Sequence, residues 1–231
     1  MSINLISTES KSELDQKLVD FITAALKKGI VERGSASLVV SGGSTPKAMF
    51  QALSATDLDW SKVVVTLVDE RCVPDTDDQS NAKLVSENLL QNAAAAAHYE
   101  PTFVVDEGLA ACQARFKTHA VLSQTYDIVI LGMGGDAHTA SIFPEAAERD
   151  VALDLGNDDF MVETNPVTVT PMRYTQTRKK LLDTRNLLLH IVGEGKWDVF
   201  SEAQKAQVPE MPISYFIHQE HAPLSVFFAK G

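Results

Sequence analysis

Apolar residues recur along the chain in two alternating patterns. Several short segments consist mostly of branched apolar residues and predict buried strands, at residues 37–40, 62–68, 102–105, 126–131, 186–192 and 224–229. Other segments place apolar side chains at helical spacing and predict helices, at residues 10–28, 80–90, 107–122 and 193–204. This alternation is typical of an α/β fold in which helices flank a mainly parallel sheet.

The pattern weakens between residues 149 and 180, where an acidic stretch precedes an alternating segment at residues 160–170. We expect a small excursion from the main sheet near residues 149–180, because Pro166 suits an edge strand better than a central one. The chain has 231 residues, enough for a substantial core, and it shows no internal repeat and no long linker rich in proline, glycine or serine. We therefore expect residues 1–231 to form a single domain.

Three predicted strands end abruptly in polar or glycine-rich turns. One runs into GMGGDAH at residues 132–138, another into SGGSTP at residues 41–46, and a third into DER at residues 69–71. The carboxyl ends of parallel strands meet at one edge of the sheet, which is where ligands bind in such folds. We therefore expect the three turns to build one composite site.

The SGGSTP turn suits an anion. Gly42 and Gly43 let the backbone approach a ligand, and Ser44 and Thr45 precede a helix whose unpaired N–H groups favour negative charge. We expect Pro46 at the first position of that helix, with Thr45 as its cap. A tight strand-to-helix turn without a ligand would need similar residues, so this segment alone leaves both interpretations open.

His138 is the main candidate for acid–base catalysis. An imidazole suits proton transfer at neutral pH, and Asp136 lies on the same glycine turn. A buried structural histidine is the alternative. Residues 132–137 also match the G-x-G-x-x-A fingerprint of dinucleotide-binding proteins, but they lie mid-chain and Pro144 would shorten the following helix. We therefore expect no nicotinamide cofactor.

Four charged side chains near the predicted strand ends are candidates for substrate binding. Asp69 and Arg71 could orient hydroxyl groups and bind an anion, and a surface ion pair is the alternative. Lys196 lies on another glycine turn at a helix start, where a lysine can bind phosphate. Arg173 lies just before a basic run that is typical of a solvated helix face. We include Arg173 among the candidates and leave out the residues of that run. Cys72 has no evident base beside it, so we assign it to packing.

Composition narrows the classes of partner. The chain has 20 lysine and arginine residues against 31 aspartate and glutamate residues, a formal net charge of −11, which argues against nucleic acid or an anionic membrane. We see no secretory signal pattern and no apolar run near the ~20 residues that span a bilayer. The 2 cysteines are too few for a disulfide framework, so we expect a cytoplasmic protein. No ligand spacing typical of a metal site is present, and we expect no metal.

In combination, these motifs resemble the 6-phosphogluconolactonase family. The matching segments are SGGSTP at residues 41–46, DER at 69–71, GMGGDAHTASIFP at 132–144, RYT at 173–175 and GEGK at 193–196. The superfamily also contains glucosamine-6-phosphate deaminases and ribose-5-phosphate isomerases, and the resemblance implies a Rossmann-like α/β fold. Deaminases continue after the shared histidine with Ile-Ala-Phe-Asn-Glu-Pro, whereas this chain reads TASIFP at residues 139–144, as lactonases do.

The resemblance implies hydrolysis of 6-phospho-D-glucono-1,5-lactone to 6-phosphogluconate in the oxidative pentose phosphate pathway. It implies His138 as the base that activates water, and Asp69 and Arg71 as groups that hold sugar hydroxyls or stabilise developing charge. The phosphate site that it implies comprises Gly42, Gly43, Ser44, Thr45, Arg173 and Lys196. It implies no cofactor. The expected partner is a small-molecule phosphosugar lactone, and we expect a monomer or a weak homo-oligomer.

Two alternatives and two departures accompany this resemblance. A deaminase- or isomerase-like enzyme, or a non-catalytic phosphosugar-binding protein, would use similar motifs. Ala137 stands where the family usually has glycine. Either the position has a positive φ, and alanine costs about 1 kcal/mol of strain, or the backbone there is ordinary. The sequence after Arg173, at residues 176–180, is also more polar than the family norm.

Overall fold

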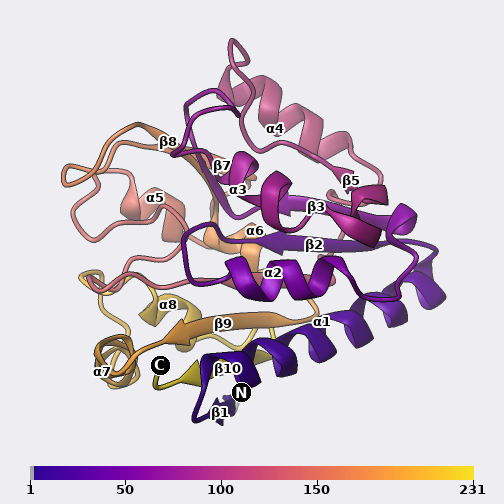
Figure 1. Ribbon diagram of the computed structural model, residues 1–231. Coiled ribbons are helices and arrows are strands. Elements are labelled where there is room, and N and C mark those ends of the chain that lie inside the picture. The colour runs from indigo at the N-terminus through magenta and orange to yellow at the C-terminus, as the bar shows by residue number, and fades with distance from the viewer. Residues whose placement is uncertain (1–2) are drawn as a thin grey trace.

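Short apolar segments form a seven-stranded parallel sheet with the strand order β1-β10-β9-β6-β2-β3-β5 (Figure 1). The computed structural model describes residues 3–231. The strands of this sheet are β1 (Asn4–Thr8), β2 (Ala36–Val40), β3 (Val63–Leu67), β5 (His98–Tyr99), β6 (Ile128–Leu131), β9 (Leu187–Val192) and β10 (Leu224–Ala229). All of its neighbouring strands pair in parallel, which confirms the predicted α/β class.

Helices cover both faces of the sheet, because its central strands are apolar on both sides. The helices are α1 (Lys11–Arg33), α2 (Lys47–Ser54), α3 (Asn81–Asn88), α4 (Leu109–Thr118), α5 (Arg149–Leu153), α6 (Arg178–Leu182), α7 (Glu194–Ala203) and α8 (Ser214–Ile217), with 3-10 turns η1 (Trp60–Lys62) and η2 (Asn92–Ala96). Along β6, Ile128 and Ile130 pack with α1, α2 and α3, whereas Val129 and Leu131 pack with α4, α7 and α8. Figure 1 shows α2 in front of the sheet and α6 behind it. No helix among residues 3–231 is both long and apolar enough to cross a membrane.

A second, smaller sheet stands above the carboxyl ends of the main strands. It has the antiparallel order β4-β8-β7, formed by β4 (Asp69–Arg71), β8 (Arg173–Gln176) and β7 (Met161–Thr164). The excursion predicted near residues 149–180 thus contributes α5, β7 and β8. β4 follows β3 almost directly, so the small sheet is tied to the edge where the predicted site lies (Figure 1).

The strand order reverses between β2 and β6. From β2 the chain continues to β3 and β5 on one side, whereas β6, β9 and β10 lie on the other. Loops that leave two such strands diverge and leave a crevice between them. The Ser41 hydroxyl spans the start of this crevice, since it donates to the Ile130 carbonyl at 2.9 Å and accepts from the Gly132 N–H at 3.0 Å.

Two local predictions were wrong. Residues 102–105 form no strand, and β5 at His98–Tyr99 takes the edge of the sheet instead. The valines at positions 104 and 105 are 39% and 50% exposed, so their apolar pattern does not reflect burial. Thr45 does not cap α2: Pro46 occupies the cap position, with φ of −82°, and no side chain bonds to the helix end. The N–H groups there consequently remain available.

Candidate active site

A cavity of about 260 Å³ opens at the carboxyl ends of β2 and β6, between their glycine turns. This is the position where open α/β sheets usually bind ligands. All nine candidate residues line it, namely Gly42, Gly43, Ser44, Thr45, Asp69, Arg71, His138, Arg173 and Lys196. Segments that are far apart in the sequence therefore meet around one small volume.

His138 lies half-buried in the wall of this cavity. Its Nδ1 lies 2.5 Å from Asp136 Oδ1, and its ring stacks on Phe143 with centroids 4.2 Å apart. An ionised carboxylate only accepts hydrogen bonds, so Nδ1 carries the proton of the neutral ring. Nε2 then holds the lone pair. A base oriented in this way by a carboxylate is the arrangement that general-base catalysis needs.

The glycine at position 134 makes this arrangement possible. A Cβ on Gly134 would lie 2.2 Å from Nδ1 of His138 and 2.4 Å from Oδ1 of Asp136. The backbone closes the turn around the pair, since Gly134 N donates to His138 O at 2.9 Å and Ala137 N donates to Gly134 O at 3.1 Å. Only glycine fits where the imidazole and the carboxylate approach the backbone so closely.

Two arginines and a carboxylate from the small sheet form the opposite wall. Arg71 and Arg173 are direct partners in the β4–β8 ladder. Burial, and then the charge of Arg71, lower the pKa of Arg173 below its ordinary value. Ser141 links the group, because its hydroxyl donates to Asp69 Oδ2 at 2.5 Å and accepts from Arg173 Nη1 at 3.4 Å. Within residues 3–231 neither arginine forms an ion pair with a carboxylate, so their charge is available to an anion.

Glu70 lies between Asp69 and Arg71 in sequence but has a structural role. Its carboxylate is 2% exposed and accepts from the N–H groups of Asn81 at 2.8 Å and Ala82 at 2.6 Å, and from the Ser80 hydroxyl at 3.1 Å. It thereby satisfies the first N–H groups of α3. Burial raises the pKa of Glu70, against the opposing effect of these N–H donors. Glu70 anchors α3 beside the cavity.

The turn after β2 brings backbone donors to the cavity. A Cβ on Gly42 would lie 1.9 Å from Asn81 Oδ1, so the side chain of Asn81 packs where any other residue would project. Gly43 has φ of +91°, which favours glycine. Asn81 Nδ2 donates to Asp69 O at 3.0 Å and fixes the turn against β4. The residues that follow, Ser44 and Thr45, line the cavity at the start of α2.

Lys196 supplies a cation at the β9 end of the cavity. It lies in the first turn of α7, directly after the loop in which Gly193 has φ of +99°. The side chain is half-buried, and burial lowers the pKa of Lys196 below its ordinary value. Its ammonium forms no ion pair and no hydrogen bond with the part of the chain that the structure describes. A desolvated cation without a partner is ready to receive an anionic group.

Comparison with known proteins extends this picture to the whole chain. Residues 9–225 match the family described as "Glucosamine-6-phosphate isomerases/6-phosphogluconolactonase". The chain belongs to this family. A 6-phosphogluconolactonase of Rhizobium meliloti is 43% identical over 99% of this chain and 100% of its own length, and one of Mesorhizobium japonicum is 38% identical over 99% and 96%. The crystal structure of a 6-phosphogluconolactonase from Shewanella baltica is 38% identical, with a TM-score of 0.93 over 99% of this chain and 98% of that one. The resemblance predicted from the motifs is confirmed.

Ala137 stands where the resemblance led us to expect glycine, and its backbone is left-handed. Ala137 has φ of +66°, so this position does require a positive φ, and alanine there costs about 1 kcal/mol of backbone strain. The side chain is 1% exposed within the apolar core, and its carbonyl accepts from Ile213 N at 3.1 Å. Packing and this hydrogen bond hold the backbone in place and offset the strain.

Two residues of the cavity wall were not predicted from the sequence. Asn81 and His190 line the cavity but were not predicted, because Asn81 resembles an ordinary helix-start residue and His190 lies inside an apolar strand.

Cys72 was assigned to packing from the sequence. Burial, with the nearby charges of Glu163 and Glu70, raises the pKa of Cys72 to about 12. Its thiol therefore stays protonated and unreactive at neutral pH.

His190 carries a prediction for stability. Burial, together with the charges of Lys11 and Lys196, lowers the pKa of His190 from 6.5 to about 3. Below pH 6.5 the His190 side chain therefore binds a proton in the unfolded chain but not in the folded chain. The contribution of His190 to the free energy of unfolding is complete above pH 6.5 and is lost as the pH falls toward 3. Between pH 7 and pH 5, we expect the free energy of unfolding of the parent to fall by about 2 kcal/mol more than that of the His190→Asn variant. Urea unfolding at both pH values measures this, and equal losses would contradict it.

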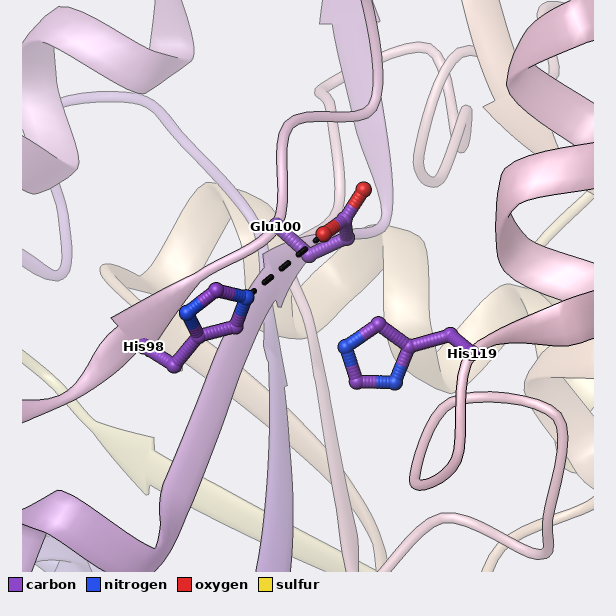
Figure 2. A group of neighbouring side chains, drawn as sticks. All are labelled: His98, Glu100 and His119. Atoms are coloured by element: carbon purple, nitrogen blue, oxygen red, sulfur yellow. Dashed lines mark ion pairs between the residues drawn. The ribbon is translucent and has the colours of Figure 1, made fainter.

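A group of potential metal ligands lies away from the cavity and consists of His98, Glu100 and His119. Figure 2 shows both imidazoles turned toward Glu100, with His98 Nε2 3.7 Å from its carboxylate. His119 Nδ1 accepts from the N–H groups of residues 121 and 122, so in the neutral ring Nε2 holds the proton instead of a lone pair. Glu100 also forms an ion pair with Arg115. Hydrogen bonds and charge pairing account for these side chains without a metal ligand role.

Proposed function

We propose that the protein hydrolyses 6-phospho-D-glucono-1,5-lactone to 6-phosphogluconate, the lactonase step of the oxidative pentose phosphate pathway. One observation carries the proposal: an oriented imidazole shares a single cavity with three cations that have no carboxylate partner in the described part of the chain. Relatives 38% to 43% identical over nearly the whole chain are 6-phosphogluconolactonases. All nine proposed residues line this cavity.

His138 acts first as base and then as acid. Nε2 accepts a proton from a water molecule, and the water oxygen forms a bond to the lactone carbonyl carbon. The tetrahedral intermediate then collapses, and the bond between that carbon and the ring oxygen breaks. The imidazolium returns its proton to the ring oxygen, which leaves as a hydroxyl. Asp136 accepts from Nδ1–H throughout and stabilises the imidazolium.

The remaining residues bind and polarise the substrate. We assign the 6-phosphate to the backbone of Gly42 and Gly43, the residues Ser44 and Thr45, and the cations of Arg173 and Lys196, all of which line the cavity. Asp69 and Arg71 hold sugar hydroxyls or stabilise the charge that develops on the carbonyl oxygen. No step requires a metal or an organic cofactor.

Asp136→Asn tests the orientation of the base. An amide at this position can present its NH₂ group to Nδ1, which favours the tautomer that places the proton on Nε2 and removes the base. We expect kcat to fall about tenfold or more while KM stays near the parent value, because Asp136 does not line the cavity. Steady-state kinetics at neutral pH measures both constants. A change confined to KM would contradict this role.

A direct comparison of substrates separates the proposal from its main competitor. A deaminase-like member of the family would release ammonia from glucosamine-6-phosphate. We expect acid release from fresh 6-phosphogluconolactone above the spontaneous rate, and no ammonia from glucosamine-6-phosphate under the same conditions. Ammonia release without lactone hydrolysis would replace the proposal by the deaminase, and tight phosphosugar binding without either reaction would replace it by a binding protein.

A further inference from the structure

Beneath the cavity, two buried polar atoms face each other without a hydrogen bond. His190 Nε2 on β9 and Asp15 Oδ1 on α1 lie 3.6 Å apart, and neither has a hydrogen-bond partner among residues 3–231. The two side chains are 3% and 9% exposed. The other oxygen of Asp15 is engaged, since Lys11 Nζ lies 2.5 Å from Oδ2. The pair therefore forms the inner end of a charged chain that leads from α1 to the cavity.

A histidine at this position has no structural reason of its own. The other residues of β9 are leucine, isoleucine and valine, and His190 lies on the same face as Leu188, which packs against α1. A leucine in its place would complete this apolar layer, whereas a polar ring that is incompletely hydrogen-bonded costs stability. Such a cost, at a side chain that lines the substrate cavity, points to a functional role.

The charges around the ring determine where its proton lies. Lys11 pairs with Oδ2 of Asp15, and Oδ1 faces Nε2 of His190, so the negative charge of Asp15 favours the neutral tautomer with its proton on Nε2. Nδ1 then carries a lone pair on the side that lines the cavity. Burial, and then the charges of Lys11 and Lys196, lower the pKa of His190, so the ring is neutral at neutral pH. A neutral acceptor and an ammonium that has no partner among residues 3–231 thus line the same cavity.

We propose that Asp15 and His190 form a positioning pair for Lys196. Asp15 favours the Nε2–H tautomer of His190, and when substrate binds, Nδ1 accepts a hydrogen bond from the Lys196 ammonium. That bond fixes one ammonium proton inward and directs the other two toward the phosphate of the substrate. The proposal rests on the phosphate-binding role given above to Lys196. His190 is a positioning residue, since it acts on the substrate only through Lys196.

Two replacements of His190 separate its two nitrogens. His190→Gln keeps a donor near the Nε2 position for Asp15 but removes the acceptor at Nδ1. His190→Asn keeps an oxygen at the Nδ1 position but loses contact with Asp15. We expect Gln to raise KM about tenfold, the effect of one lost hydrogen bond to a charged group, with the loss on KM rather than kcat. Asn recovers most of that affinity. A purely structural role would make both variants change in step with their unfolding free energy.

Asp15→Asn tests the tautomer with the ring intact. The single amide oxygen is taken by Lys11, which turns the NH₂ group toward His190 Nε2 and moves the ring proton to Nδ1. That proton would then point at an ammonium, so we expect KM to rise as much as in His190→Gln. Thermal melts confirm that each variant is folded. Parent-like KM in both Asp15→Asn and His190→Gln would overturn the proposal.

Nitrogen NMR reads the same feature without turnover. Long-range ¹H–¹⁵N spectra of histidine-labelled protein distinguish a protonated ring nitrogen from a bare one, and the signals lost in His190→Asn identify residue 190. We expect protonated Nε2 and bare Nδ1 in the parent, and the reverse in Asp15→Asn. A proton on Nδ1 in the parent would overturn the proposal. If the protein failed to hydrolyse the lactone but showed bare Nδ1, the proposed function would fail while the tautomer stood.

Discussion

His138→Asn is expected to lower kcat for 6-phosphogluconolactone by about 100- to 10,000-fold, the range that positioned acid–base groups contribute. The variant removes the one group that both takes the proton of water and returns it to the ring oxygen. KM should change little, because the cations proposed to bind the phosphate belong to other elements, β8 and α7. The fold should persist, since His138 is half-buried at a surface turn and is not a core residue. Stopped-flow acid release and a thermal melt measure these properties together.

A matched histidine variant controls for this result. His221 is exposed, and its side chain is neither in the cavity nor hydrogen-bonded within residues 3–231. His221→Asn should keep the parent kcat and KM. A folded His138→Asn enzyme with near-parent turnover would show that another group activates the water, and Asp69 would then be the next carboxylate to test.

Lys196→Met should raise KM for the lactone by about 10- to 100-fold, the cost of losing hydrogen bonds to a charged group. Methionine keeps the length of the side chain but removes the half-buried ammonium that has no partner of its own. We expect kcat at saturating substrate to fall much less, because the proposed role of Lys196 is to bind the phosphate and not the carbonyl. Steady-state kinetics, with inorganic phosphate as a competitive inhibitor, measures the effect.

A surface lysine serves as the control for that variant. Lys205 is 70% exposed and pairs with Glu202, so Lys205→Met should leave KM unchanged. In Lys196→Met, inhibition by inorganic phosphate should weaken in parallel with KM. An unchanged KM together with unchanged phosphate inhibition would place the phosphate elsewhere in the cavity, most simply against Arg71 and Arg173.

The central part of the fold and the site was predictable because it rests on local signals. Branched apolar segments that end in glycine identified β2 and β6, and parallel pairing places their ends at one edge. The motif residues at Asp69 and Arg173 could be expected near that edge. The pairing of β4 with β8, which sets Arg71 opposite Arg173, could not be predicted, because these are three- and four-residue strands without a distinct periodicity.

The features that the sequence did not reveal depend on contacts across long separations. Asp15 and His190 meet through the packing of α1 on β9, and each lies within a stretch that otherwise predicts ordinary core. Residues 102–105 show the opposite error, since their β-favouring side chains remain partly exposed in a loop. Local pattern therefore identified strands and turns, whereas burial and pairing required the three-dimensional arrangement.

The most direct test of the proposed activity is the initial rate of acid release from freshly prepared 6-phosphogluconolactone. The rate is measured with increasing amounts of purified protein and against a protein-free blank in the same weakly buffered solution. The proposed function predicts a rate above the blank that grows in proportion to protein and disappears in His138→Asn. A rate equal to the blank at every concentration of folded protein would contradict it.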